Sequence, residues 1–388
     1  MPVGRRGSGA LKQHGPAVHV EHLRSARQLR ERPSKWLWPQ MTMISCRSSS
    51  SARLAVGLRN GDPPDDHEHP GFSGRDSRGA MAYMPPMDLR YSEEVRRAKE
   101  QGVPLVAMET SVVAQGLPYP DNLGAARACE EAVRRVGAVP APIAVVDGQV
   151  YIGLEEPQMR RLAEGRERLL KLGSRDLPVA IARGGTGGTT VSATCELAAA
   201  AGIRVFATGG IGGVHRGVAE QLDISQDIWA LARFPVAVVC AGAKSVLDLP
   251  KTLEALESVA VPVIGVGTDE LPSFYSRSSG LPLEHRVEDA SEAARIARAR
   301  FETLGQGGLL FTVPPPEETS LPRADVELHI ASALAEADRQ GIRGKAVTPF
   351  LLSEMAKRTG GKTLRANLAL LTNNARFAGQ LAVAYAQR

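Results

Sequence analysis

The segment 204–217, RVFATGGIGGVHRG, decides the fold class, because a short apolar run passes directly into a glycine-rich loop. A helix is predicted over 223–233 from the spacing of its apolar side chains, and the apolar run 236–240 predicts the next strand. The alternation continues with a helix over 248–259 and a strand over 261–266. Strands that alternate with helices form a largely parallel sheet with helices on both faces. We therefore expect an α/β protein with a three-layer α/β/α architecture.

The same pattern extends in both directions along the chain. Apolar runs predict further strands over 104–108, 142–146, 150–152 and 309–313. Helical spacing predicts helices over 121–136, 155–170, 189–201, 291–304, 324–339, 349–359 and 363–386. Neither an internal repeat nor a second linker interrupts this pattern, so residues 89–388 are expected to form one domain of roughly 300 residues.

The charge of the chain is unevenly distributed. The 388 residues have a net charge of +5, but residues 1–60 contain eleven Lys or Arg and two Glu, so the remainder carries −4. A mildly acidic body is a poor surface for a polyanion, which argues against a nucleic-acid partner. No apolar run approaches the roughly 18 residues that a membrane-spanning helix needs. Four scattered cysteines without a C-x-x-C pair argue against a disulfide framework or a zinc site, so we expect a cytoplasmic protein with reduced thiols.

Residues 1–88 have the composition of an unfolded segment, rich in Arg, Ser, Gly, Pro and His and without sustained periodicity. They could be a disordered extension, an acid-poor organellar transit peptide, or upstream translation of a gene that begins at Met81, Met84 or Met87. The lack of a clear amphipathic helix favours the first or the third explanation. No apolar core long enough for a secretory signal follows the N-terminal arginines.

Two residues that follow predicted strands are candidates for catalysis, since ligand sites in open α/β sheets gather at the carboxyl ends of strands. Lys244 comes after the strand 236–240 and three small residues, where a partly desolvated amine can act as a nucleophile or form a Schiff base. Its alternative role is that of an ordinary surface lysine. Glu109 directly ends the strand 104–108 and is a candidate general acid or base, or else a capping or ion-paired glutamate.

Two glycine-rich loops also lie at strand or helix ends. The loop 209–217 lacks the third glycine of a dinucleotide fingerprint, because His215 stands there, so a tight turn or close approach to a ligand is the better interpretation. The segment 184–191, GGTGGTTV, opens a predicted helix, where backbone N–H groups could bind a phosphate or Thr189 could cap the helix. Lys171, just past a predicted helix, could add positive charge or complement the helix dipole.

Asp223 and Asp227 stand four residues apart within the predicted helix 223–233, which would place both carboxylates on one helical face. Two carboxylates without histidine neighbours suit a hard cation such as Mg²⁺ or Mn²⁺. The spacing is equally consistent with Asp223 as a simple N-terminal helix acid.

Several segments, in order along the chain, resemble the pseudouridine-5′-phosphate glycosidase family, which also includes indigoidine-cluster A-type proteins. The resemblance covers essentially all of residues 95–386. The matching segments are 106–120 (VAMETSVVAQGLPYP), 137–143 (GAVPAPI), 174–178 (SRDLP), 205–217 (VFATGGIGGVHRG), 223–227 (DISQD), 238–249 (VVCAGAKSVLDL), 344–352 (GKAVTPFLL) and 373–375 (NNA).

The resemblance implies a lyase reaction that interconverts pseudouridine 5′-phosphate and water with uracil and ribose 5-phosphate through a C–C glycosidic bond. It also implies a homotrimeric α/β/α fold and a divalent metal, usually Mn²⁺, with Mg²⁺ as the alternative. By motif position it implies these roles: Glu109 as catalytic acid, Lys244 as nucleophile, Lys171 as phosphate ligand, Val191, Ser225, Gln226 and Asp227 as substrate contacts, and Asp223 as metal ligand.

This chemistry agrees with the residues themselves. A C-glycoside has a poor leaving group, so hydrolysis by a carboxylate pair is difficult. An imine between Lys244 and C1′ of the opened ribose supplies an electron sink, while Glu109 moves protons between the ring oxygen and the base. One departure concerns the base: Val313 stands where relatives have an asparagine that is thought to contact it.

Two other functions remain alternatives. The departure at Val313 would fit a sugar-phosphate-binding homologue with lost turnover or altered base specificity. A nicotinamide oxidoreductase is a more distant alternative, because the glycine loop matches its fingerprint poorly. Some members of the family carry a fused sugar-kinase domain. The resemblance in this sequence includes no such domain, so we expect a separate pseudouridine kinase as the pathway partner.

Overall fold

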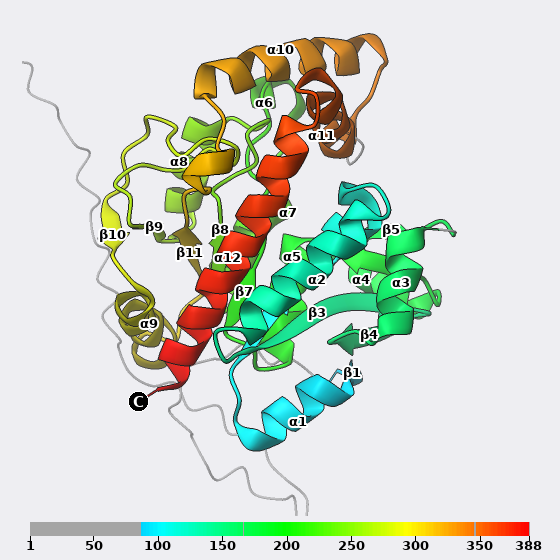
Figure 1. Cartoon of the computed structure of the whole chain (residues 1–388), viewed down its shortest axis with the longest axis vertical. Helices are drawn as coiled ribbons and strands as arrows, with labels where there is room; N and C mark the ends of the chain where they lie inside the picture. The colour runs from blue at the N-terminus through cyan, green and yellow to red at the C-terminus, as the bar shows by residue number, and fades with distance from the viewer. Residues whose placement is uncertain (1–86, 166, 345–346, 388) are drawn as a thin grey trace, which may run out of the picture. The chain divides into compact units, whose positions relative to one another are not determined.

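A computed structural model describes residues 87–387 of the chain, except residues 166 and 345–346. The predicted N-terminal extension therefore lies almost wholly outside the described residues. The described part contains the expected, mostly parallel sheet between two layers of helices (Figure 1). Its strand order is β1-β4-β3-β2-β7-β8-β11-β9-β10, with β6 also pairing to β3 and β5 pairing to β6. Only the pairings of β3 with β4 and with β6 are antiparallel among these strands.

The strands are short. Seven of them match the predicted apolar runs, whereas β1, β5, β6 and β10 were not predicted. Their bounds are β1 Leu89–Tyr91, β2 Leu105–Met108, β3 Val139–Val146, β4 Gln149–Ile152, β5 Leu170–Leu172, β6 Gly187–Thr189, β7 Val205–Ala207, β8 Ala237–Cys240, β9 Val263–Val266, β10 His285–Val287 and β11 Leu309–Thr312. The central strands β7, β8 and β11 are buried along their whole length, because helices cover both of their faces.

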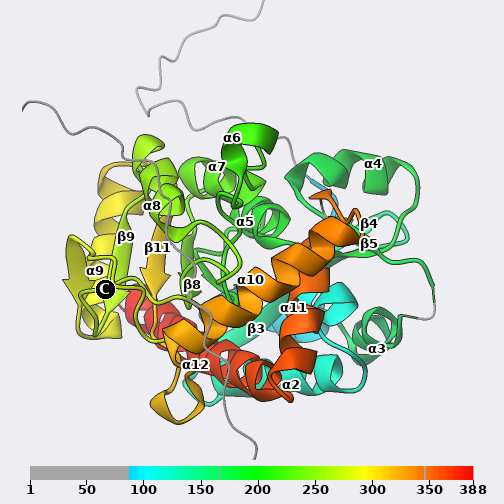
Figure 2. The same cartoon turned by 90° about the horizontal axis from the view of Figure 1, so that it is seen from above.

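Two helical layers enclose the sheet, as the view from above shows (Figure 2). On one face lie α2 (Asp121–Arg134), α9 (Ala290–Arg298) and α12 (Lys362–Ala386), and α12 packs on β2, β7 and β8. On the other lie α5 (Val191–Ala200), α7 (Gln226–Arg233) and α8 (Leu249–Ser258), with α5 against β2, β3 and β7. The three-layer α/β/α prediction is confirmed.

The remaining helices lie at the margins of these layers. They are α1 (Glu93–Gln101), α3 (Glu156–Glu164), α4 (Leu177–Ala182), α6 (Val218–Gln221), α10 (Arg323–Arg339) and α11 (Val347–Arg358). The last two form a helical pair at the end of α12 nearest residue 362 (Figure 1). Within the described chain, no helix combines the length and apolarity that crossing a membrane requires.

Two helix predictions were wrong because strands occupy one end of the predicted range. The helix predicted over 155–170 ends at Glu164, where Gly165 adopts a left-handed conformation, and residues 170–172 form β5 instead. The helix predicted from residue 189 begins at Val191, because residues 187–189 form β6. Glycine at position 187 permits this pairing, since a Cβ there would lie 2.2 Å from the carbonyl oxygen of Leu170.

Candidate active site

A cavity of about 270 Å³ opens at the carboxyl ends of the central strands. Met108 of β2 pairs with Ala207 of β7, and Ala207 pairs with Val239 of β8, so the residues that follow these strands emerge side by side. Glu109 and Lys244 both line this cavity. The prediction that strand ends bring the acid and the lysine together at one edge of the sheet is confirmed.

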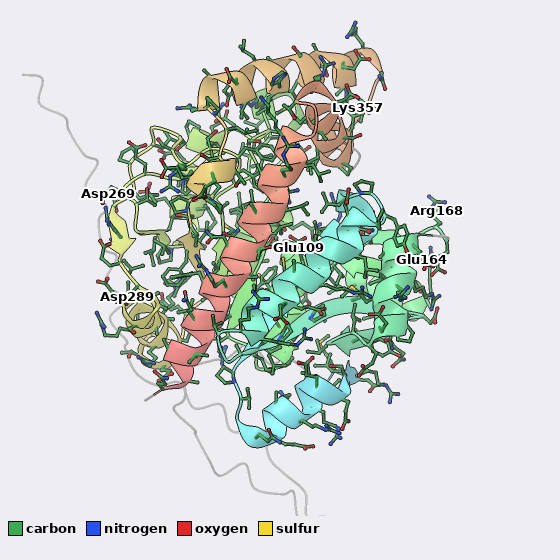
Figure 3. The ribbon with its side chains drawn as sticks, in the orientation of Figure 1. Glu109, Glu164, Arg168, Asp269, Asp289 and Lys357 are labelled. Carbon is green, nitrogen blue, oxygen red and sulfur yellow. The ribbon has the colours of Figure 1, made fainter. Side chains whose placement is uncertain are left out.

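Glu109 is held by the hydroxyl groups of its neighbours. The Thr208 hydroxyl donates a hydrogen bond to Oε1, and the Ser111 hydroxyl donates one to Oε2. Thr208 is fixed in turn, because the Asn374 side-chain amide of α12 donates to its carbonyl oxygen at 2.9 Å. Figure 3 shows Glu109 in the interior between α2 and α12, whereas Glu164 lies at the periphery. The carboxyl group is thus oriented by the fold, as general acid–base catalysis requires.

Lys244 ends a tight loop after β8. Its N–H donates to the carbonyl oxygen of Ile211 at 3.0 Å, which ties the lysine to the glycine loop. Gly242 has φ 86°, and a Cβ there would meet the Pro272 carbonyl oxygen at 2.2 Å, so the loop needs a glycine. Among the described residues, the amine of Lys244 has no hydrogen-bonding or ion-pairing partner. An unengaged amine at the cavity wall is suited to nucleophilic attack once deprotonated.

The two aspartates do not share a helical face, which corrects the cation site predicted from their spacing. Helix α7 begins only at Gln226, because the Ser225 hydroxyl caps it by accepting from the N–H of Asp227. Asp223 therefore precedes the helix. Asp227 is buried, and its two oxygens accept from the N–H groups of Ser192 at 2.9 Å and Gly212 at 2.8 Å. Asp227 thus joins the start of α5 to the glycine loop.

Asp223 lies at the cavity beside His215, with 3.9 Å between Oδ2 and the histidine Nδ1. Burial lowers the pKa of His215; the positive charges of Lys171 and Lys244 lower it further, and the charge of Asp223 opposes them. The two lysines and the histidine therefore share one electrostatic environment. Across the residues that the structure describes, no group of three or more His, Cys, Asp or Glu side chains is arranged to hold a metal.

Lys171 lies in β5, not at a helix end, and lines the cavity together with Arg175, Thr190 and Ser192. The hydroxyl oxygens of Thr190 and Ser192 lie 3.2 Å apart. These two cations, together with the two hydroxyl groups at the start of α5, form a wall that is suited to binding an anion. The side chain of Val191, which the resemblance implies as a substrate contact, is buried in the core, and Val191 does not line the cavity.

Thr189 does not cap α5. Its hydroxyl donates to the carbonyl oxygen of Ile143, across the sheet. The predicted substrate residues Ser225 and Gln226 do line the cavity, and Gln226 also accepts from the N–H of Arg175 at 3.1 Å. The side chain of Gln226 thereby joins α7 to the segment that follows β5.

Val313 lies outside the cavity lining. It is nearly buried, its N–H donates to the Cys240 carbonyl oxygen at 2.8 Å, and it borders a different hollow together with Asn373 and Phe377 of α12. The structure therefore does not place this position where a bound base in the cavity would contact it.

Sequence reasoning missed several cavity residues that come from distant parts of the chain. Arg175 lies within the segment 174–178 and Ser192 directly follows the segment 184–191, but neither had a predicted role, and no role was predicted for the start of α11 or of α12. The residues concerned are Arg175, Ser192, Phe274, Thr348, Leu352, Asn367 and Leu371. The only available signal was a polar residue directly after a predicted strand. That signal is absent at Phe274, Thr348, Leu352, Asn367 and Leu371.

The parallel α/β fold, with an amine, a carboxylic acid and an anion-binding wall around one cavity, defines an enzyme that acts on a small molecule. Residues 94–384 match the family model described as "Indigoidine synthase A like protein". The chain belongs to this family.

Similar proteins agree with this membership. The chain is 82% identical, over 78% of its length and 99% of the relative's, to a pseudouridine-5′-phosphate glycosidase of Myxococcus xanthus. It is 52% identical, over 75% of its length and 95% of the relative's, to a protein of the same name from Caldanaerobacter subterraneus.

Two solved structures share the fold. An indigoidine synthase A-like protein of Thermotoga maritima is 35% identical, with a TM-score of 0.71, over 79% of this chain and 99% of that one. The prealnumycin C-glycosynthase AlnA, solved with ribulose 5-phosphate, is 39% identical, with a TM-score of 0.72, over 78% of this chain and 98% of that one.

Proposed function

We propose that this chain is an enzyme that reversibly cleaves the C–C glycosidic bond of pseudouridine 5′-phosphate to give uracil and ribose 5-phosphate. The observation that carries this proposal is that Lys244 and Glu109 line one cavity at the sheet edge. The relatives named pseudouridine-5′-phosphate glycosidase support the substrate, and the C-glycosynthase with bound ribulose 5-phosphate supports C-glycoside chemistry on a pentose phosphate.

Each chemical step has a residue suited to it. Glu109 protonates the ribose ring oxygen as the ring opens, and the amine of Lys244 bonds to C1′. The C1′–C5 bond then breaks, C5 of the base takes up a proton and leaves as uracil, and the sugar remains on Lys244 as an imine. Water hydrolyses the imine, which releases ribose 5-phosphate and the free amine. The sum is one substrate and one water consumed for two products.

The other end of the cavity is suited to the phosphate. Lys171 and Arg175 supply positive charge there, and the hydroxyls of Thr190 and Ser192 supply hydrogen-bond donors. Ser225 and Gln226 stand along the same wall and are proposed to contact the substrate. Asp227 also lines this wall and is proposed to contact the substrate, and its two oxygens accept from the backbone N–H groups of Ser192 and Gly212.

Asp223 is the proposed ligand of a divalent metal, Mn²⁺ or alternatively Mg²⁺. Its carboxylate faces the cavity, is 37% exposed and, together with water molecules, could hold a hydrated ion. Such an ion would supply positive charge near a bound phosphate or sugar. Asp223→Ala should abolish Mn²⁺ binding measured by calorimetry, and Mn²⁺ binding that persists in the variant would contradict the assignment.

Release of uracil from pseudouridine 5′-phosphate, followed by chromatography with absorbance detection, tests the proposed function. We expect turnover by the wild type and a stoichiometric amount of ribose 5-phosphate. Tight binding of ribose 5-phosphate without turnover would instead support the second candidate, a sugar-phosphate-binding homologue, which the anion-binding wall alone would also serve.

We also propose a homotrimer that works in the cytoplasm beside a separate pseudouridine kinase, which would supply the phosphorylated substrate. Leu222 and Trp229, which flank the cavity residues of α7, are 79% and 61% exposed, and a neighbouring copy would cover such apolar side chains. Sedimentation velocity at micromolar concentration should give a species of three chains; a monomer would contradict the assembly.

A further inference from the structure

Helix α2 carries a carboxylate on its inner face. Leu123, Ala126 and Val133 form the stripe that faces the core, and Glu130 occupies a position on this stripe, seven residues after Leu123. Its side chain is only 16% exposed. A carboxylate in such a place costs free energy unless it is well paired, so its presence calls for a physical reason.

Ion pairing supplies only part of that reason, because Glu130 shares its one cationic partner among the described residues with Glu94. The nearest cation is Arg134, whose Nη1 lies 3.5 Å from Oε2 of Glu130. Arg134 is already engaged by Glu94 of α1 through two hydrogen bonds of 2.8 Å. Burial raises the pKa of Glu130, the charges of Glu94 and Glu156 raise it further, and Arg134 opposes them.

Glu130 and Glu109 line a common inner cavity. This second cavity, of about 30 Å³, lies behind the active site and is bordered also by Thr110, Thr208 and Cys129. A space of that size accommodates one or two water molecules. Glu109 lines both cavities, so this residue forms part of the wall between the substrate cavity and the inner one.

We propose that Glu130 relays protons between Glu109 and solvent through water in the inner cavity, a proposal that rests on the function proposed above. In one direction the Glu109 proton passes to a water molecule, that water gives a proton to the Glu130 carboxylate, and Glu130 releases it at its exposed edge. Charge and atoms balance at each transfer. Cys129 does not compete as a carrier, because burial raises the pKa of its thiol to about 12.

The relay answers a need of the reaction. A bound nucleotide fills the substrate cavity and separates Glu109 from the water on that side. Glu109 must nevertheless give up and regain protons in each cycle. The inner cavity provides a route to solvent that the substrate does not block.

The test compares Glu130→Gln with a matched control on the same helix. Glu131→Gln makes the same chemical change one residue along, where the carboxylate pairs with Arg135 at the surface. For Glu130→Gln we expect kcat to fall at least about tenfold, KM to change less than about twofold, and the solvent deuterium isotope effect on kcat to rise. Glu130→Asp, which keeps a titratable group, should restore part of kcat, and Glu131→Gln should match the wild type.

A wild-type value of both kcat and its isotope effect in Glu130→Gln overturns the relay. So does an equal loss of kcat in Glu130→Gln and Glu130→Asp with no change in the pH profile, since that pattern indicates a packing role. If Glu130→Gln does not fold, the pH profile of Glu130→Asp decides in its place, and an unshifted profile overturns the relay. A wild-type protein that releases no uracil overturns the proposed function itself, which is a different result.

Discussion

At the residue scale, Asp223 and Asp227 have identical side chains four residues apart but different surroundings and different proposed roles. Asp223 precedes helix α7 and presents a partly exposed carboxylate to the cavity. Asp227 is buried, and its oxygens accept backbone hydrogen bonds from Ser192 and Gly212. Asp223 is therefore accessible to an ion that enters the cavity, whereas Asp227 holds two segments of the cavity wall together.

Replacement of Asp227 by asparagine should destabilise the fold. The amide has one oxygen in place of two, so one of the N–H groups of Ser192 and Gly212 loses its acceptor in a buried place. We expect unfolding free energy to fall by about 1.5–3 kcal/mol, as measured by guanidinium denaturation. Asp223→Asn, the matched control, should change it by no more than about 0.5 kcal/mol. Equal stability of both variants would contradict the assigned roles.

Part of this site could be predicted from the sequence. Glu109 and Lys244 each follow an apolar run, and parallel strands bring their carboxyl ends to one edge, so local pattern sufficed. The helical register of Asp223 could not be predicted, because the position where α7 begins depends on its cap at Ser225. Lys171 was placed at a helix end because β5 forms only through pairing with β6, a non-local contact. The helical spacing places Glu130 on the core-facing stripe of α2, seven residues after Leu123, but the cavity that it lines together with Glu109 depends on tertiary packing.

At the scale of elements, the buried carboxylate of Glu130 in α2 lowers the free energy of unfolding at neutral pH. Because the pKa of Glu130 is higher in the folded state, the native state binds more protons than the unfolded state at pH values between the two pKa values. Wild-type stability therefore falls as the pH rises from the unfolded-state pKa through the folded-state pKa. Glu130→Gln removes this loss. Its stability relative to wild type should therefore increase from about pH 4, near the unfolded pKa, upward.

Denaturation in urea at several pH values between 4 and 8 measures this difference. Glu131→Gln, whose carboxylate lies at the surface beside Arg135, should give a stability difference that does not grow with pH. A difference for Glu130→Gln that is constant across the range would show that its carboxylate titrates alike in both states.

Arg216 joins three elements near the cavity. Its guanidinium donates to the carbonyl oxygens of Ser245 and Leu247, directly after Lys244, and to both oxygens of Glu327 in α10. Arg216→Lys keeps the charge but loses the fork geometry, so kcat/KM should fall by about tenfold. Glu327→Gln leaves the contacts to Ser245 and Leu247 in place and should cost less than about threefold. Equal losses in steady-state assays would contradict this division.

At the scale of the whole molecule, the described residues that line the cavity all lie between positions 109 and 371. A chain that begins at Met87 retains all of them and spans residues 94–384, which match the family model. We expect its kcat and KM for pseudouridine 5′-phosphate to lie within about twofold of the full chain, since unchanged contacts leave the transition state equally stabilised. A large loss of kcat in the shorter chain would assign residues 1–86 a part in the reaction.

The account depends most on a covalent bond between the substrate and Lys244. Borohydride reduction in the presence of ribose 5-phosphate traps an imine as a stable amine, and peptide mass spectrometry locates it. We predict a pentose-phosphate adduct on Lys244 in the wild type and no adduct in Lys244→Ala, whereas Lys251→Ala, which changes an exposed lysine of α8, labels as the wild type does. Equal labelling of the Lys244→Ala variant, or an adduct confined to another lysine, would contradict the account.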